Sequence, residues 1–256
     1  MQHVEPALER SVEALVEALL GARHAVVLTG AGISTESGIP DFRSPGTGLW
    51  ERMDPMETLS ARAFWENPAR FYRVAAETWL PPLLEARPNA AHQVLARLEA
   101  AGVVKCVITQ NIDGLHHKAG SRRVLEVHGH LRWAKCTRCG RRYDLEAVLR
   151  QLLDSNVGPY CPCGGPIKPM VVLFGDPMPP AFEEALAEAA RCDLMVVVGS
   201  SLTVDPANAL PVLAPRVIIN NLQPTPMDER AALRLPYPAG AVWAAVAQRL
   251  TALRVL

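Results

Sequence analysis

A glycine-containing segment directly after a short apolar run is the feature that most constrains the fold of this chain. The run covers residues 24–28, and its apolar character predicts a buried strand of a parallel sheet. In the segment that follows, residues 29–44, Gly30 and Gly32 let the backbone turn sharply and approach a ligand closely. This is the beginning of a dinucleotide-binding loop. The fingerprint is incomplete, because Thr35 stands where a GxGxxG motif has its third glycine.

The residues beyond this turn also differ from those of an ordinary dinucleotide-binding dehydrogenase. No acidic residue follows a second strand about twenty positions later, where such enzymes bind the ribose. Instead, the Pro-Asp-Phe-Arg sequence of residues 40–43 places a carboxylate, an aromatic ring and a cation in consecutive positions. The spacing still favours a diphosphate-binding loop over an ordinary strand-to-helix turn.

The rest of the chain alternates between strand and helix patterns. Apolar runs predict further strands over residues 103–109, 124–127, 169–174, 193–198 and 217–220. Helical spacing of apolar residues predicts helices over residues 8–19, 88–102, 181–190 and 241–253, the first of them ended by Gly21. This alternation is typical of an α/β fold with a doubly wound parallel sheet, in which ligands bind beyond the carboxyl ends of the strands.

Two segments interrupt the alternation and predict a second, smaller lobe. Residues 45–85 lack a sheet pattern, and residues 131–167 contain four cysteines. We therefore expect a large lobe made of residues 1–44, 86–130 and 168–256, with a ligand-binding cleft between the lobes. The aromatic residues of the first insertion are expected to form a core cluster rather than a ligand cage, and they are Phe64, Trp65, Phe71, Tyr72 and Trp79.

The four clustered cysteines predict one structural zinc ion. Cys136 and Cys139 form a CxxC pair, and Cys161 and Cys163 form a CxC pair followed by two glycines. Four thiolates close a tetrahedral shell and leave no position for a substrate, whereas a catalytic metal would need a histidine or carboxylate ligand and a vacant site. The CxC pair is one residue shorter than the usual knuckle, which changes the geometry expected for one ligand.

Charge and hydropathy exclude several classes of function. The 256 residues include 26 basic and 26 acidic side chains, and this balance argues against general binding to nucleic acid or a membrane surface. No apolar run approaches the roughly 20 residues of a membrane span. The first ten residues lack the apolar core of a secretory signal. With metal-type cysteine spacing and no export signal, we expect a cytoplasmic protein, and we expect a monomer.

A general base cannot be chosen from the histidines by composition. His128 follows a predicted strand and precedes a glycine, which would give a ligand room. The chain has seven histidines, however, and His116, His117 and His130 are competing candidates. A lone histidine is more often a satisfied polar residue than a catalytic base.

Taken together, these motifs resemble those of the sirtuins, the NAD-dependent protein lysine deacylases. The motifs are GAGIS at 30–34, GIPDFRS at 38–44, TQNIDGLH at 109–116, HG at 128–129, the cysteine quartet, FGD at 174–176 and GSSLTVDP at 199–206. They occur in the family's order and spacing from about the first helix to the last. The resemblance implies a Rossmann-like lobe, a smaller lobe formed by a zinc ribbon and a helical insertion, and a cleft where NAD meets an acetylated protein or peptide.

The resemblance also implies roles for individual residues. The expected NAD-binding residues are Gly30, Ala31, Gly32, Phe42, Arg43, Gln110, Asn111, Ile112, Asp113, Gly199, Ser200, Ser201, Asn221 and Val242. Asn111 would also hold a water and His128 would be the catalytic base, since the reaction needs a proton removed from a ribose hydroxyl. Val172, Leu173, Phe174 and Gly175 would form a strand edge that pairs with the substrate peptide.

We therefore predict an NAD-dependent protein lysine deacetylase that releases nicotinamide, free lysine and O-acetyl-ADP-ribose. Family members that prefer succinyl or malonyl groups carry a Tyr-x-x-Arg pair, but here Tyr72 is followed at that spacing by Ala75. A second departure is Asp176, where the family usually has glutamate. The alternatives are a desuccinylase, a mono-ADP-ribosyltransferase using the same NAD site, and a non-enzymatic NAD-binding or zinc-scaffold protein.

Overall fold

The computed structural model describes residues 6–41, 54–155 and 158–255, so Phe42 and Arg43 lie outside the described residues. Its elements in chain order are α1 (Pro6–Gly21), β1 (Ala25–Thr29), the 3-10 helices η1 (Ala31–Ile33) and η2 (Thr35–Ser37), α2 (Pro55–Thr58), α3 (Ala61–Glu66), α4 (Pro68–Glu77), α5 (Leu80–Glu85), α6 (Ala90–Ala100), β2 (Val104–Thr109), α7 (Leu115–Lys118), β3 (Val124–Glu126), β4 (Gly129–Cys136), β5 (Arg142–Asp144), α8 (Leu145–Ser155), β6 (Ile167–Val171), α9 (Pro180–Arg191), β7 (Leu194–Val198), η4 (Ala207–Leu213), β8 (Val217–Asn220), η5 (Asp228–Arg230), β9 (Leu233–Leu235) and α10 (Ala239–Ala252).

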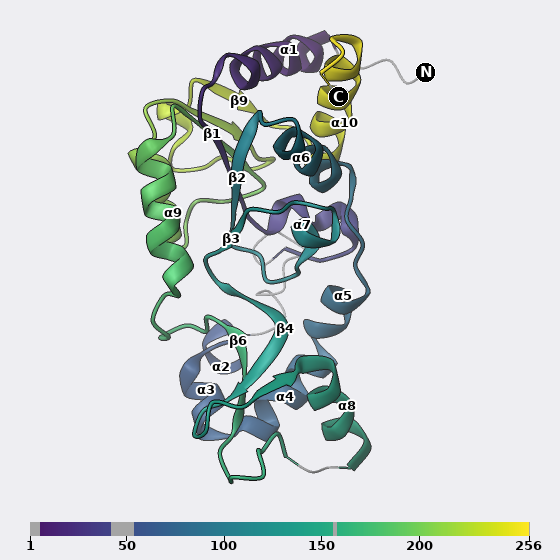
Figure 1. The fold of residues 1–256 in the computed structure, drawn as a ribbon, viewed down its shortest axis with the longest axis vertical. Coiled ribbons are helices and arrows are strands. Elements are labelled where there is room, and N and C mark those ends of the chain that lie inside the picture. Colours follow the sequence, from purple (N-terminus) through teal and green to yellow (C-terminus); the bar gives the residue numbers. More distant parts are fainter. Residues whose placement is uncertain (1–5, 42–53, 156–157, 256) are drawn as a thin grey trace.

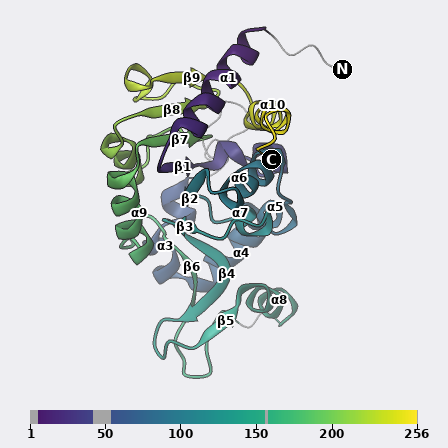
Figure 2. The same ribbon diagram turned by 45° about the horizontal axis from the view of Figure 1, so that its top comes forward.

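The large lobe is built on a parallel sheet with the strand order β3-β2-β1-β7-β8-β9 (Figures 1 and 2). Its strands are paired in parallel throughout, as the predicted doubly wound α/β fold requires. From β1 the chain first adds strands on one side and then, from β7 onward, on the other. The carboxyl ends of β1 and β7 therefore flank the point where the strand order reverses, which is where such sheets bind ligands.

Successive residues of the central strands face two different helix layers. Val27 and Val196 pack in a core with α1, α6 and α10, whereas Val26 and Val197 pack in a core with α9. Figure 2 shows the sheet between these layers. Because both faces are covered, the residues of β1 and β7 are all buried. Their continuous apolar sequence follows from this two-sided burial.

The small lobe contains a three-stranded antiparallel sheet with the order β5-β4-β6. Figure 1 shows it below the parallel sheet, together with α2, α3, α4 and α8. The strand that the sequence predicts over residues 169–174 is therefore displaced. It runs from Ile167 to Val171 and pairs antiparallel with β4, so it does not resume the parallel sheet. An apolar run in the sequence indicates that a strand is buried, but it does not indicate which other strand it pairs with.

The aromatic residues of the first insertion form most of the expected core cluster. Phe64, Phe71, Tyr72 and Trp79 are buried against the cysteine-containing lobe. The Phe64 and Phe71 rings meet edge to face, with centroids 5.5 Å apart. Trp65 differs from the expectation, because it is 55% exposed while its ring edge still contacts Phe64.

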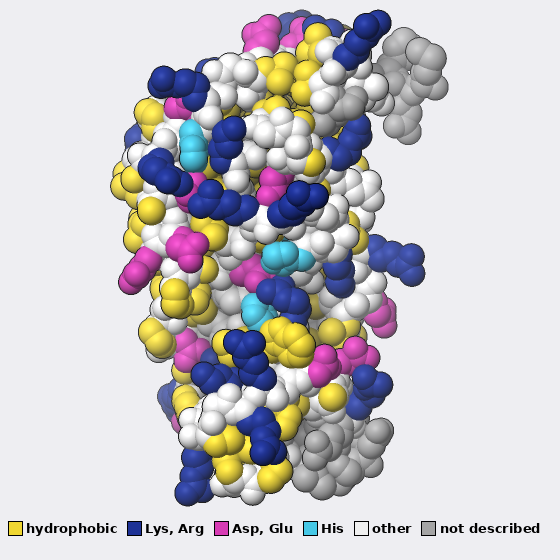
Figure 3. Space-filling model, viewed as in Figure 1, with side chains coloured by type: hydrophobic (Ala, Val, Ile, Leu, Met, Phe, Trp, Pro, Cys, Tyr) yellow, Lys and Arg dark blue, Asp and Glu magenta, His cyan; other side chains and the backbone are white. Residues whose placement is uncertain are grey.

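The outer surface carries charges of both signs. On the face drawn in Figure 3, acidic and basic side chains are interspersed along the length of the molecule, in keeping with equal numbers of each in the sequence. Among the described residues, no helix combines the length and the apolar character needed to cross a membrane.

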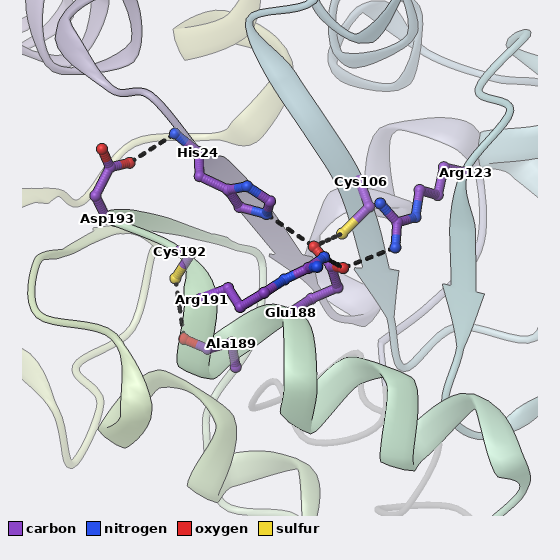
Figure 4. A network of polar contacts seen from close by, with 8 residues as sticks. All are labelled: His24, Cys106, Arg123, Glu188, Ala189, Arg191, Cys192 and Asp193. Atoms are coloured by element: carbon purple, nitrogen blue, oxygen red, sulfur yellow. Dashed lines mark hydrogen bonds and ion pairs between the residues drawn. The ribbon is translucent and has the colours of Figure 1, made fainter.

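A buried carboxylate joins several elements at the amino-terminal edge of the parallel sheet (Figure 4). The Glu188 side chain on α9 is 2% exposed and is paired with His24 before β1, Arg123 before β3 and Arg191. Burial alone would raise the pKa of Glu188, but the hydrogen bond from His24 and the charges of the two arginines together lower it. This network holds α9 against the end of the sheet opposite the candidate site.

Replacing Glu188 with glutamine is expected to destabilise the protein by about 2 kcal/mol, because the buried carboxylate accepts charge-assisted hydrogen bonds from Arg123 and Arg191 that a neutral amide would make more weakly. The lowered pKa means that the carboxylate contributes fully above its ordinary value of 4.5 and that this contribution is lost as pH falls through the folded value. Urea unfolding at pH 7 and at pH values below 4.5 measures both effects. The matched control is Glu66→Gln, because the Glu66–Arg62 pair is exposed and is expected to contribute almost nothing. Equal stability of the two variants at pH 7 contradicts the prediction.

Candidate active site

The glycine turn after β1 packs directly against a second glycine turn after β7. The Gly32 N–H donates to the Gly199 carbonyl at 2.8 Å, and the Gly30 N–H donates to the Val198 carbonyl at 3.1 Å. A Cβ on Gly32 would lie 2.7 Å from the Gly199 Cα, and a Cβ on Gly199 would lie 2.1 Å from the Ile33 nitrogen. Gly199 also has a φ of 64°. Glycine is thus required at these positions because the two backbones contact each other there. The sequence alone does not reveal this contact.

The segment after β2 is held against the glycine turn by side-chain hydrogen bonds. Asn111 donates through Nδ2 to the Gly30 carbonyl at 3.0 Å and to Ser34 Oγ at 3.2 Å. Ser34 Oγ in turn donates to Asp113 Oδ2 at 2.8 Å. Gln110 donates through Nε2 to Ser200 Oγ at 2.8 Å. The three segments that follow β1, β2 and β7 therefore form one connected polar wall.

His128 lies between β3 and β4, and one of its ring nitrogens is held by the main chain. Its Nδ1–H donates to the Gln110 carbonyl at 3.0 Å, because a carbonyl can only accept. In the neutral ring this leaves Nε2 as the free acceptor. Burial lowers the pKa of His128 below its ordinary value of 6.5, and the Gln110 carbonyl partly offsets that effect. The side chain is thus a neutral base near pH 7.

The competing histidines occupy other surroundings. His116 is 2% exposed, and its Nε2 contacts Thr29 Oγ1 at 2.9 Å. His117 lies 3.6 Å from Glu126, and His130 has a buried Nδ1 without a partner among the described residues. Of the four candidate histidines, His128 alone is among the described residues lining the cavity introduced next.

A cavity of about 490 Å³ lies where the three polar segments meet the edge of the small lobe. The predicted site residues that line it are Gly30, Ala31, Gly32, Gln110, Asn111, Ile112, Asp113, His128, Val172, Leu173, Phe174, Gly175, Gly199, Ser200, Ser201 and Asn221. This volume is within the usual range for small-molecule and cofactor sites. The structure therefore brings residues from distant parts of the sequence into one site.

Val242 is the one described member of the predicted set that lies elsewhere. Its side chain is fully buried in the core formed by α1, α6 and α10. The apolar periodicity of α10 accounts for that position, which leaves no side-chain contact with the cavity. Asn221 lines the cavity, whereas its neighbour Asn220 is buried and donates to the Leu235 and Tyr237 carbonyls.

The expected peptide-binding edge continues from the end of β6. The Val172 N–H donates to the His128 carbonyl at 2.8 Å, and the Phe174 N–H donates to the Leu59 carbonyl at 3.0 Å. These hydrogen bonds connect the edge to His128 and to the first insertion. Gly175 has a φ of 92° and makes no backbone hydrogen bond to another described residue.

Several cavity residues were not chosen from the sequence. Ser34 lies inside the GAGIS motif, and its burial at 1% exposure beside Asn111 and Asp113 marks it as part of the site. Its position in the motif was a signal that could have identified it. Leu59, Trp79 and Leu83 form an apolar wall contributed by the first insertion, and no local pattern indicated that they face the cavity.

The charged side chains among the described residues that line the cavity are acidic, and one of them, Asp176, is paired with Lys168. The described lining includes the carboxyl groups of Asp41, Asp113, Asp176 and Asp205, but no lysine or arginine. Burial raises the pKa of Asp113, while the Leu115 N–H and the Ser34 hydroxyl partly offset the shift. Tyr72 does not line the cavity, since its hydroxyl donates to the Ile167 carbonyl inside the small lobe.

The four cysteines of the small lobe meet in a geometry that fits zinc. Their sulfur atoms all lie within 4.8 Å of one another. The Cys136–Cys163 and Cys139–Cys161 sulfur atoms are 3.5 and 3.6 Å apart. A tetrahedral shell with Zn–S bonds of about 2.3 Å places its sulfurs about 3.8 Å apart. The CxC pair is therefore compatible with a closed shell.

At two of the four cysteines, nearby donors favour the thiolate form that zinc requires. The Cys139 and Arg138 N–H groups each lie 3.4 Å from Cys136 Sγ, and they lower the pKa of that thiol. The Cys163 N–H and the Tyr143 hydroxyl lower the pKa of Cys161 to about 6. No histidine or carboxylate joins this cluster among the described residues, so the shell suits a structural ion rather than a catalytic one.

Comparison with known proteins identifies similar sequences along most of the chain. The sequence model of the Sir2 family matches residues 30–206. NAD-dependent protein deacetylase 2 of Caldanaerobacter subterraneus is 50% identical over 216 residues, which are 84% of this chain and 86% of that protein. NAD-dependent protein deacylase 2 of Archaeoglobus fulgidus is 42% identical over 253 residues, covering 96% of this chain and 99% of that protein.

Solved structures agree with these sequence relationships. A structure of Sir2 with a p53 peptide and NAD+ has a TM-score of 0.86 and 39% identity, and the match covers 94% of this chain and 99% of that one. A structure solved for the mechanism and regulation of Sir2 enzymes has a TM-score of 0.87 and 42% identity, with 96% and 100% covered.

Proposed function

This chain belongs to the Sir2 family, and we propose the residues through which it acts as an NAD-dependent protein deacetylase. The observation that carries the assignment is the single cavity wall formed by the glycine turns, the Gln110–Asp113 segment and His128. The acetylated peptide would approach from the other side, along the edge that follows β6.

The residues present fit NAD. The paired glycine turns leave a surface without side chains, and Ser200 and Ser201 present hydroxyl groups beside it. Asn111 and Asp113, fixed by Ser34, would hold the nicotinamide ribose and carboxamide. When bound, NAD supplies a nicotinamide leaving group and a sugar carbon that accepts the acetyl oxygen. The protein positions these groups and excludes water.

His128 would remove the proton from a sugar hydroxyl in the later part of the reaction. Its Nδ1–H is engaged by the Gln110 carbonyl, so Nε2 is the atom that takes the proton. The lowered pKa keeps Nε2 unprotonated near pH 7. The hydrogen bond to Gln110 fixes the ring orientation, and it links the base to the segment that would bind NAD.

The substrate is expected to be an acetylated lysine rather than a succinylated one. A succinyl carboxylate would enter a cavity whose described lining has no lysine or arginine and several aspartates. Burying an unpaired carboxylate costs several kcal/mol, so we expect kcat/KM for an acetyl-lysine peptide to exceed that for its succinyl counterpart roughly 100-fold. Turnover of one peptide sequence carrying either group measures this ratio, and a succinyl preference overturns the prediction.

The activity itself is tested by incubating the protein with an acetyl-lysine peptide, with and without NAD. We expect nicotinamide, deacetylated peptide and O-acetyl-ADP-ribose in equal amounts by mass spectrometry. Modification of the peptide or the protein by ADP-ribose, without loss of the acetyl group, would instead indicate ADP-ribosyl transfer. Absence of any NAD-dependent product would reject both activities.

We further propose that the protein works in the reducing environment of the cytoplasm. A zinc centre of four thiolates requires reduced cysteines, and all six cysteines of the chain are free. We also propose that the chain acts as a monomer, as expected from its sequence.

A further inference from the structure

A buried polar cluster lies beneath the cavity wall, at the carboxyl ends of β1 and β2. Thr29 and Thr109 are the last residues of these strands and face each other in the parallel pairing. Both are buried, as is His116 on α7, with exposed fractions of 0%, 3% and 2%. His116 is absent from the described cavity lining, so the cluster supports the site from below.

The hydrogen bonds of the cluster lead from His116 through Thr29 to Thr109, each group donating to the next. Thr29 Oγ1 donates to Thr109 Oγ1 at 2.8 Å. The single hydroxyl proton of Thr29 is then used, so Thr29 Oγ1 accepts from His116 Nε2 at 2.9 Å. His116 Nδ1 is buried without a partner among the described residues. Placing the proton on Nε2 is therefore preferable, because the other tautomer would leave a buried donor unpaired.

The segment that lines the cavity is attached to this cluster through its main chain. The Asn111 N–H donates to Thr109 Oγ1 at 3.1 Å, and the Gln110 N–H donates to the Thr29 carbonyl at 2.9 Å. The Gln110 carbonyl accepts the Nδ1–H of His128. The hydroxyl pair thus lies directly under the residue that would bind the nicotinamide ribose and next to the residue that orients the base.

We propose that His116 is a positioning residue for the deacetylation reaction, acting through the Thr29–Thr109 hydroxyl pair on the Gln110–Asn111 segment. The inference rests on the proposed function of the cavity. His116 itself touches neither substrate, and its ring is too far inside the protein to serve as the base. Its Nε2–H directs the Thr29 hydroxyl toward Thr109 Oγ1, and this holds in place the oxygen that accepts from the Asn111 N–H.

The chemistry of the site favours a positioning role over simple core filling. A buried imidazole with an unpartnered Nδ1 costs free energy that an apolar side chain of similar size would not. Burial and the neighbouring His92 ring, 4.9 Å away, lower the pKa of His116 well below 6.5. The ring therefore stays neutral near pH 7 and keeps one donor and one acceptor.

The test compares three replacements that differ in where they present a donor. The side-chain amide of His116→Gln reaches the position of Nε2 and can still donate to Thr29, whereas that of His116→Asn reaches only the position of Nδ1. His116→Phe keeps the ring volume without any donor. We expect the Asn and Phe variants to lose about 10- to 100-fold in kcat/KM for NAD, because small misplacements of reacting groups have effects of that size. The Gln variant should stay within about threefold of the wild type.

Two further measurements separate positioning from general destabilisation. KM for the peptide should be unchanged, since its proposed edge follows β6 in the other lobe. Val94→Ala on α6 is the control, because it creates a cavity in the core that α6 shares with α1, α10 and the sheet, and Val94 has no part in the hydrogen bonds of the cluster. It should lower the melting temperature and leave kcat/KM at 25 °C unchanged. Equal activity in all three His116 variants, or losses that follow melting temperature alone, overturns the proposal.

NAD binding measured by calorimetry keeps this proposal separate from the proposed function. If the wild type binds NAD but deacetylates no peptide, the deacetylase assignment fails while the positioning role remains testable. In that case the Asn and Phe variants should still bind NAD about tenfold or more weakly than the Gln variant. Identical NAD affinities in the three variants count against the positioning role whatever the activity.

Discussion

Replacing His128 with alanine is expected to lower kcat/KM for deacetylation by about 100- to 10,000-fold, the usual contribution of a general base. His128 is the histidine that lines the described cavity, and its Nε2 is free to accept a proton. Breakage of the nicotinamide–ribose bond does not need this base, so exchange of labelled nicotinamide into NAD should persist in the variant. Product analysis by mass spectrometry and the exchange assay measure the two stages separately.

The pH dependence gives a second measurement on the same residue. Because burial lowers the pKa of His128, the wild type should lose activity only as pH falls through a value below 6.5. The activity that remains in the His128→Ala variant should not show this decrease at low pH. His130→Ala is the matched control, since His130 lies two residues away and outside the described cavity lining. Undiminished deacetylation by His128→Ala would falsify the assignment of the base.

Replacing Cys136 with serine is expected to remove the bound zinc and abolish deacetylation. Structural zinc sites contribute about 10 to 16 kcal/mol of apparent binding free energy, more than the whole stability of most domains. Cys136 ends β4, which pairs with both β5 and β6, so the three strands of the small sheet depend on the metal centre. The proposed peptide edge continues from β6 and should be lost with it. Metal analysis should give about one zinc per wild-type chain and almost none in the variant.

The control for the zinc prediction is Cys192→Ser. Cys192 is also buried, but it lies before β7, and its thiol donates to the Ala189 carbonyl, an interaction that a hydroxyl can replace. This variant should keep its zinc and most of its activity. Full zinc content in Cys136→Ser, or undiminished activity after prolonged chelation, would show that the four thiols do not hold an essential ion.

Sequence reasoning reached the fold class because the signals for it are local. The apolar runs that became β1, β2, β7 and β8 are each a few residues long, and burial on both faces of the sheet forces that composition. β9, only three residues long and partly exposed, gave no comparable signal and was missed. The position and sheet of β6 were also predicted incorrectly, because they are set by pairing with β4, which is distant in sequence.

Candidate site residues were found where a motif holds them in consecutive positions, as in the Gln110–Asp113 segment. Residues whose role depends on a distant partner were not found in that way. Ser34 became significant only when the structure placed it between Asn111 and Asp113. Val242 is a different case, because its side chain is buried with α10 and it does not line the described cavity, so the adenine contact that the resemblance implies for its backbone stays a prediction.

The sequence by itself determined the alternation of strands and helices, the cysteine spacing and the identity of the polar residues at the strand ends. Each of these is set by periodicity or by neighbours along the chain. Only the tertiary structure decided that Gly32 and Gly199 meet, that His128 rather than His116 lines the cavity, and that the CxC pair joins the CxxC pair in one cluster of four sulfur atoms. Those facts depend on contacts between residues far apart in sequence, which form only when the burial of apolar surface brings the two lobes and the switch point of the sheet together.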